Sequence, residues 1–210
     1  MIKLYFLPYA CCTSVHIILK EIQVEFELIC VGRNAEEQTK ARFAMLNPLK
    51  SVPVLELEDG TVITQCIAIL EYLADQFPQH NLLGKIGSVE RIEVIKWLSF
   101  VATDLHKSFS PLFQLEQISA DNTVTQQNVR NWALTNISKY LMVLNEHLAD
   151  KSYLAAEQFS IADAYLFVVY QWTKYTGVST QNYPHLSNYI ERIAERDSIK
   201  AALRHEAQYL

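Results

Sequence analysis

Two adjacent cysteines lie where a short apolar segment gives way to a helical pattern. Residues 2–7 are mostly apolar, Cys11 and Cys12 follow shortly after Pro8, and the helical pattern begins at Thr13. A thiol at a strand-to-helix junction lies near backbone N–H groups and the positive end of the helix dipole. That environment lowers a cysteine pKa from about 8.5 toward about 3.5–7.5. The pair therefore predicts thiolate chemistry, with a plain packing role as the alternative.

Two further motifs could hold a ligand beside these thiols. Pro53 follows Val52 at the start of a predicted strand, where proline is tolerated because it lacks an N–H. Gln65 and Cys66 begin the next predicted helix, where an amide side chain and free N–H groups can hold a carboxylate and an amine. Each motif alone is also typical of ordinary structure: a trans proline at a strand start, and a helix start capped by Thr64.

A polar stripe marks one side of a later helix. Ser99, Thr103, His106 and Ser110 recur at helical spacing, with Lys107 beside them. A histidine among hydroxyl groups can donate a hydrogen bond to a thiolate or act as a base near neutral pH. A stripe that merely faces solvent is the alternative.

The sequence lacks the motifs for metal binding, phosphate binding or serine hydrolysis. The thiols and the nearby histidine do not show the paired spacing that zinc sites use, so we expect no metal. There is also no glycine-rich phosphate loop and no Gly-x-Ser-x-Gly motif.

Composition narrows the class of protein. The 210 residues are half apolar and one-fifth charged, and the net charge is −5 without a basic block, which argues against nucleic acid as a partner. No apolar run approaches the roughly 20 residues of a membrane span, and the start reads as a strand rather than a signal peptide. All four cysteines lie in the first third, which favours free thiols in a reducing compartment. We therefore expect a cytoplasmic protein with no membrane partner.

The first 78 residues alternate between strand and helix patterns. Period-two and apolar segments predict strands, and residues 59–60 (Asp-Gly) predict a hairpin turn. The order β-α-β-α-β-β-α is that of the thioredoxin-like fold. The predicted strands are 2–7, 24–31, 54–58 and 61–63, and the predicted helices are 13–22, 35–46 and 65–77.

Residues 88–210 predict helices only, after a linker at 79–87. One long helix runs from Ser88 toward Phe109 with Pro111 as its limit, and a second spans residues 125–149. Ser160 and Asp163 form a capping pattern before a third helix that is apolar all round, and a final helix follows Pro184. The fold class is therefore an α/β thioredoxin-like domain followed by an all-α helical-bundle domain.

The order of these motifs resembles that of cytosolic glutathione transferases. The resemblance covers essentially the whole chain and is greatest to the bacterial beta class, whose first motif has the form Pro-Gly-Ala-Cys-Ser. Residues 103–107, Thr-Asp-Leu-His-Lys, are also similar to the beta-class sequence Thr-Glu-Leu-His-Lys. The resemblance to this family implies a homodimer that binds glutathione and a small electrophilic substrate.

The resemblance also implies roles for individual residues. Cys11 matches the active-site cysteine beside the glutathione sulfur, and Val52 would pair through its backbone with glutathione, held by a cis Pro53. Gln65 and Cys66 match positions that bind the γ-glutamyl end. His106 matches a cleft residue and is the second catalytic candidate. The remaining glutathione-binding candidates are Ser99, Thr103, Asp104, Lys107 and, for the glycyl carboxylate, Arg33.

Several departures from the family pattern bear on affinity. Tyr9 replaces a glycine, which would narrow the site, and Cys12 replaces a serine, which adds a second oxidisable thiol. Gln65 stands where a glutamate is usual, so the charge that would pair with the glutamyl ammonium is lost. The family often supplies a basic residue that binds the glycyl carboxylate of glutathione, and that residue has no clear counterpart in this sequence.

The leading hypothesis is a glutathione transferase that directs the glutathione thiolate at an electrophile, with thiol–disulfide exchange through Cys11 as a further activity. Two alternatives stay open. One is a glutathione-fold protein that binds without turnover, and the other is a glutathione-dependent isomerase or peroxidase.

Overall fold

The apolar strand β1 (Ile2–Phe6) lies inside a four-stranded sheet with the order β2-β1-β3-β4. The computed structural model describes residues 1–120, 122–155 and 157–210. Strand β2 (Phe26–Cys30) is parallel to β1, whereas β3 (Val54–Glu56) is antiparallel to β1 and forms a hairpin with β4 (Val62–Thr64). The sheet is mixed, as the predicted thioredoxin-like order requires.

Helices cover both faces of this sheet, which explains why three consecutive residues of β1 are buried. Leu4 and Phe6 belong to one core with α1 (Thr13–Glu21) and α3 (Cys66–Gln76). Tyr5 faces the other way and stacks on Phe43 of α2 (Glu37–Leu46). A strand covered on both faces reads as a continuous apolar run instead of an alternating one.

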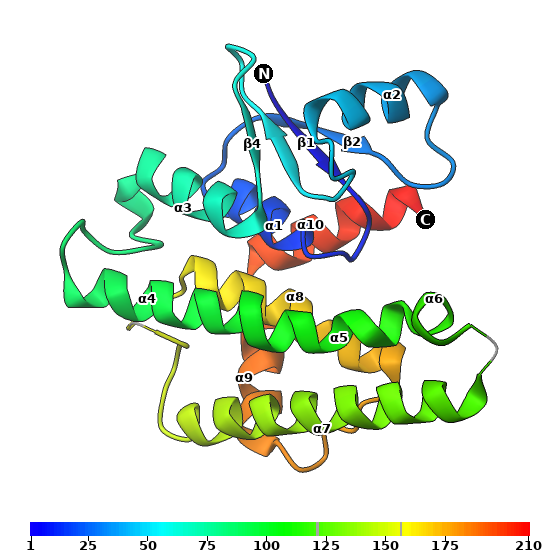
Figure 1. Ribbon diagram of the computed structural model, residues 1–210. Coiled ribbons are helices and arrows are strands. Elements are labelled where there is room, and N and C mark those ends of the chain that lie inside the picture. Colours follow the sequence, from blue (N-terminus) through cyan, green and yellow to red (C-terminus); the bar gives the residue numbers. More distant parts are fainter. Residues whose placement is uncertain (121, 156) are drawn as a thin grey trace.

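The rest of the chain is helical (Figure 1). The central helix of this part is α8 (Ile161–Thr176), of which twelve of sixteen residues are buried. The predicted capping box at its start is present, with Asp163 accepting from the backbone N–H and hydroxyl of Ser160. The helices are α4 (Val89–Phe100), α5 (His106–Phe113), α6 (Leu115–Ser119), α7 (Thr123–His147), α8 (Ile161–Thr176), α9 (Pro184–Ala194) and α10 (Asp197–Glu206), with 3₁₀ turns at Pro78–His80 and Ala207–Tyr209.

The first long helix differs from the prediction. A π-helical turn, Val101–Leu105, separates α4 from α5, and the helix continues past Pro111 to Phe113. Pro111 lies only two residues from that end, so its missing N–H removes one bond near the end of the helix. The short helix α6 was also not predicted.

The predicted final helix is two helices, because Arg196 adopts an extended conformation between α9 and α10. Its guanidinium bonds to Glu21 of α1 and lies 4.2 Å from the ring centroid of Phe159. The turn redirects α10 back along α1, so the C-terminal helix packs against the sheet-containing part (Figure 1). Within the described ranges, no helix is both long and apolar enough to cross a membrane.

Candidate active site

Cys11 lies in the turn between β1 and α1, and its side chain is half-buried. Its thiol donates to the backbone oxygen of Val52 at 3.6 Å. The neighbouring Cys66 thiol lowers the pKa of the Cys11 thiol below its ordinary value, and the positive charge of Lys107 acts in the same direction, against the effect of burial. The pKa of the Cys11 thiol is thus shifted in the direction that favours the thiolate.

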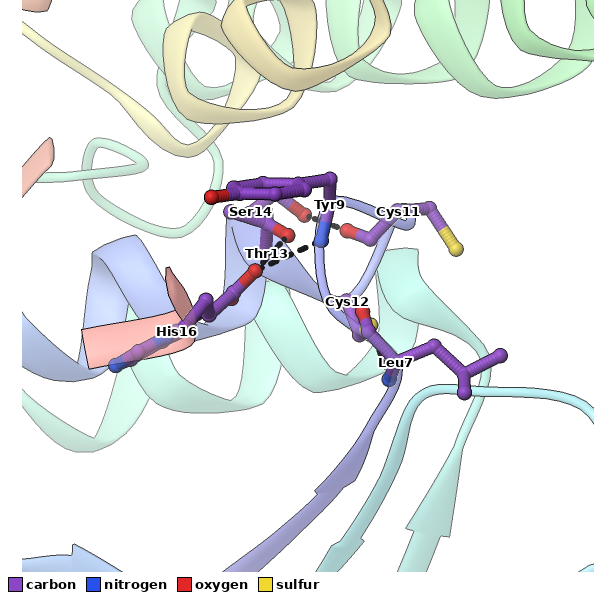
Figure 2. A network of polar contacts seen from close by, with 8 residues as sticks. Leu7, Tyr9, Cys11, Cys12, Thr13, Ser14 and His16 are labelled. Atoms are coloured by element: carbon purple, nitrogen blue, oxygen red, sulfur yellow. Dashed lines mark hydrogen bonds and ion pairs between the residues drawn. The ribbon is translucent and has the colours of Figure 1, made fainter. Parts of the chain in front are cut away.

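Cys12 has a structural role instead. Its side chain is fully buried, its thiol donates to the backbone oxygen of Leu7 at 3.1 Å, and its sulfur accepts from the Leu7 N–H at 3.3 Å. Burial raises the pKa of Cys12 well above its ordinary value. Figure 2 shows the Cys11 thiol pointing away from Cys12 and from the Tyr9 ring. Burial and the raised pKa both disfavour the expectation that Cys12 adds a second oxidisable thiol.

The turn that carries Cys11 is held by two helices from the far end of the chain. Tyr9 has a φ of +59°, a strained value for a residue with a side chain. Its N–H donates to the Glu206 carboxylate at 2.9 Å, and its carbonyl oxygen accepts from the Trp172 indole at 3.0 Å. The same carboxylate accepts from the Thr13 hydroxyl at 2.8 Å and lies 2.9 Å from Nδ1 of His16.

The Val52–Pro53 peptide bond is cis, as the family resemblance implies. The loop before it is braced by the Asn47 side chain, whose amide donates to the Ser51 backbone oxygen at 2.8 Å. This bracing fixes the backbone of Val52 opposite Cys11, where a peptide-like ligand could pair with it.

The start of α3 forms the next wall of the site. Gln65 precedes the helix with a φ of +72°, and its exposed side chain lines the pocket. Gln65, and not the predicted alternative Thr64, occupies the N-cap position. Cys66 begins the helix, and its sulfur lies 3.1 Å from the Ser14 hydroxyl. Burial raises the pKa of the Cys66 thiol well above its ordinary value.

The π-helical turn places His106 and Lys107 at the cleft. Such turns shift the side chains that follow them and are frequent at functional sites. Nδ1 of His106 lies 2.7 Å from the hydroxyl oxygen of buried Tyr165, and the imidazole packs edge-on against Trp172. Burial lowers the pKa of His106 to about 4, so its imidazole is neutral at pH 7. A base that titrates near neutrality, one of the two predicted roles, is therefore disfavoured relative to hydrogen bonding.

These residues enclose a pocket of about 460 Å³ with a mixed polar and apolar lining. It brings together eight of the eleven predicted site residues but not Ser99, Asp104 or Arg33. The Ser99 backbone and the Asp104 carboxylate both lie within hydrogen-bond distance of the Thr103 hydroxyl, and Arg33 is exposed elsewhere. The pocket is lined by Cys11, Ser51, Val52, Pro53, Gln65, Cys66, Ile67, Ala102, Thr103, His106, Lys107 and Tyr165.

A second, mostly apolar hollow of about 470 Å³ adjoins the first. Cys11 and His106 line both, and the second is completed by Leu7, Pro8, Tyr9, Ala10, Phe113, Trp172 and Tyr175. Sequence reasoning missed Tyr165, Trp172 and Glu206, because nothing in the sequence indicates that they lie beside the first turn. In the described parts of the chain, no three His, Cys, Asp or Glu side chains form a metal-binding group.

The arrangement has counterparts among known proteins. Residues 10–76 match the family description "Glutathione S-transferase, N-terminal domain", and residues 96–197 match "Glutathione S-transferase, C-terminal domain". The chain is 35% identical over 206 residues to glutathione S-transferase GstA of Escherichia coli O157:H7, covering 97% of this chain and 98% of that one. It is 33% identical over 204 residues to glutathione S-transferase GST-4.5 of Xanthomonas campestris pv. campestris, with the same two coverages.

Solved structures of glutathione S-transferases are similar to this chain in fold. The bacterial beta-class glutathione S-transferase of Sphingomonas chungbukensis superposes with a TM-score of 0.86 at 35% identity, covering 97% of this chain and 98% of that one. A sphingomonad glutathione S-transferase solved in complex with glutathione gives a TM-score of 0.85 at 34% identity, covering 98% of each chain. The chain belongs to the glutathione S-transferase family.

Proposed function

We propose that this protein binds glutathione in the mixed-lined pocket and transfers its thiolate to an electrophile held in the adjoining apolar hollow. The observation that carries this proposal is that Cys11 and His106 line both spaces. A sulfur placed between these two residues would face a bound electrophile directly. Conjugation requires that juxtaposition, because a bound nucleophile reacts only at near-contact distance.

The mixed-lined pocket offers groups that suit the separate parts of glutathione. The Val52 backbone offers pairing groups to the cysteinyl part, and the start of α3 offers Gln65 and N–H groups to the γ-glutamyl end. Lys107 adds positive charge near the expected sulfur. Arg33 does not line the pocket, so it has no role in this proposed binding of glutathione.

The thiolate would be stabilised by position and charge. His106 is neutral at pH 7, and its Nδ1 is engaged by Tyr165, so Nε2 is left for a second partner. With Tyr165 as the donor, Nε2 carries the proton and can donate it in a hydrogen bond to sulfur. Stabilising the thiolate is the main catalytic task, since the thiolate is the nucleophile.

Two measurements on the whole protein test this function. The first is retention on immobilised glutathione with elution by free glutathione, and the second is turnover of chlorodinitrobenzene with glutathione. Retention together with turnover supports the proposal. Retention without turnover of any aryl or alkyl halide would favour a binding protein and contradict it.

We further propose that the protein is a cytoplasmic homodimer, as its family resemblance implies. Light scattering on the purified protein tests the oligomeric state directly. A mass equal to one chain at micromolar concentration would contradict the dimer.

A further inference from the structure

Cys11 shares its pocket with a second thiol. Cys66 donates toward the backbone oxygen of Cys11 at 3.6 Å and lies 3.1 Å from the Ser14 hydroxyl, which itself donates to that oxygen at 2.7 Å. Cys11 comes from the turn before α1 and Cys66 from the start of α3, and these two helices pack against each other on one face of the sheet. Residues 55 positions apart in the chain are thus brought together at the expected glutathione sulfur.

The other two cysteines do not offer such a partner. Cys12 is fully buried, with its sulfur held by the backbone of Leu7, and adjacent cysteines rarely meet disulfide geometry. Cys30 ends β2 and does not line the pocket. Among the thiols that the structure describes, Cys66 is the one that shares the pocket with Cys11.

The two thiols differ in exposure and in pKa, as an attacking thiol and a resolving thiol must. Cys11 is the more exposed, and the Cys66 thiol lowers its pKa, so Cys11 is disposed to attack first. Cys66 is buried and its pKa is raised, partly by the charge of a Cys11 thiolate. That charge disappears once Cys11 is bonded to another sulfur, so Cys66 becomes easier to ionise at the moment when it is needed.

We propose that Cys66 is a resolving thiol, which removes glutathione from Cys11 by forming a Cys11–Cys66 disulfide. The protein would then reduce glutathione-containing disulfides by a two-thiol mechanism, in addition to conjugation. This inference rests on the proposed function only for the binding of glutathione. The closeness of the two thiols is independent of it.

The first step consumes the substrate disulfide. The Cys11 thiolate attacks the glutathione sulfur of a mixed disulfide, the S–S bond breaks, and the released thiolate takes a proton from solvent. A Cys11–glutathione disulfide remains. The substrate is half-reduced at this point, since one of its two sulfurs has left as a thiol.

The second step releases glutathione. Cys66 loses its proton and attacks the Cys11 sulfur, the bond between Cys11 and glutathione breaks, and glutathione leaves with a proton. The substrate has become two thiols, and the two protein thiols have become one disulfide. Two further glutathione molecules reduce the protein disulfide and become glutathione disulfide, which balances the cycle.

A hydroxyl group that can hydrogen-bond the Cys66 sulfur is in place. The Ser14 hydroxyl lies 3.1 Å from that sulfur and can donate to a Cys66 thiolate as it forms. The Cys66 proton itself goes to the departing glutathione sulfur or to solvent, because an imidazole with a pKa of about 4 does not hold it at pH 7.

The test is the covalent state of the protein after brief treatment with glutathione disulfide, read by intact mass and by fragmentation of the linked peptides. The variants are Cys66→Ser, which keeps a hydroxyl donor near Ser14, and Cys30→Ser as the matched control. Fragmentation is needed because Cys11 and Cys12 lie in one tryptic peptide. Thermal melting of each variant checks that it is folded.

The proposal predicts that the wild type and Cys30→Ser form a Cys11–Cys66 disulfide and carry no glutathione. Cys66→Ser should instead keep one glutathione on Cys11. A wild type that carries the same stable adduct as Cys66→Ser, or that links Cys11 to no other protein thiol, would overturn it.

A second oxidant separates this inference from the proposed function. Dipyridyl disulfide reacts with exposed thiolates and needs no glutathione site. A Cys11–Cys66 disulfide that forms with this reagent supports the thiol pair even if the protein is not retained on immobilised glutathione. Retention and turnover without any Cys11–Cys66 disulfide under either oxidant would leave the transferase standing and overturn the resolving role.

Discussion

The N–H of Tyr9 donates a 2.9 Å hydrogen bond to the carboxylate of Glu206, 197 residues further along the chain. Glu206 is fully buried and also contacts the Thr13 hydroxyl and His16. A helix at the end of the chain thus fixes the turn that presents Cys11. The reactivity of the first turn therefore depends on the docking of α10.

Removing the Glu206 carboxylate should loosen that turn. In Glu206→Ala, three buried polar partners lose their acceptor, so we expect the free energy of unfolding to fall by about 3–5 kcal/mol. Glu206→Gln keeps an oxygen for Tyr9 and Thr13 and should lose only about 1–2 kcal/mol. Urea denaturation measures both values, and the rate of Cys11 alkylation should fall most in the alanine variant. Equal stability of the two variants would contradict this account.

The pH dependence of Cys11 alkylation reports the pKa of its thiol. The Cys66 thiol and the positive charge of Lys107 favour the thiolate, so the midpoint of the iodoacetamide rate should lie below the ordinary cysteine value. Lys107→Met removes a positive charge, which disfavours the thiolate and moves the midpoint to higher pH. Lys85→Met, which removes a lysine that does not line the pocket, is the control. A midpoint in Lys107→Met at or below that of the wild type would refute the role of Lys107.

His106 should act as a neutral hydrogen-bonding group. Because burial lowers its pKa to about 4, protonation sets in only as the pH falls toward that value. The conjugation rate should therefore show no histidine transition near neutral pH. His106→Phe removes the hydrogen bond and should reduce kcat roughly ten- to hundredfold. A transition near pH 6.5 in the wild type that is lost in His106→Phe would show a titrating base instead.

Much of the secondary structure could be predicted from the sequence because the elements concerned are specified locally. The continuous apolar run of β1 and the Ser160–Asp163 capping box both set element boundaries by nearby residues. The π-helical turn before His106 has no such local signal. The extended Arg196 is also invisible in sequence, because its cause is a contact with Glu21 in a distant helix.

The site could be predicted only in part, because contacts between distant segments leave no local signal in the sequence. Cys11, Val52 and Gln65 were found because each belongs to a local motif and because the order of these motifs resembles that of glutathione transferases. Tyr165, Trp172 and Glu206 come from helices whose docking depends on tertiary packing. Cys12 was misjudged because the sequence does not show which way either neighbouring side chain turns.

Glutathione affinity should respond to the charge at residue 65. Gln65 is exposed at the start of α3, where a γ-glutamyl ammonium is expected. A charge-assisted hydrogen bond exceeds a neutral one by about 1 kcal/mol, so Gln65→Glu should tighten glutathione binding about fivefold. Gln23→Glu, which also adds a negative charge at a residue with positive φ outside the pocket, is the matched control. Calorimetric titration with glutathione measures the change, and unchanged or weaker binding would place the ammonium elsewhere.

The central claim is that Cys11 is the protein thiol that reacts at the glutathione site. The most direct measurement is the rate at which the protein removes glutathione from a small mixed disulfide, compared between the wild type, Cys11→Ala and Cys30→Ala. We expect Cys11→Ala to lose this activity and Cys30→Ala to keep it. Deglutathionylation retained by folded Cys11→Ala would show that Cys11 is not the reacting thiol.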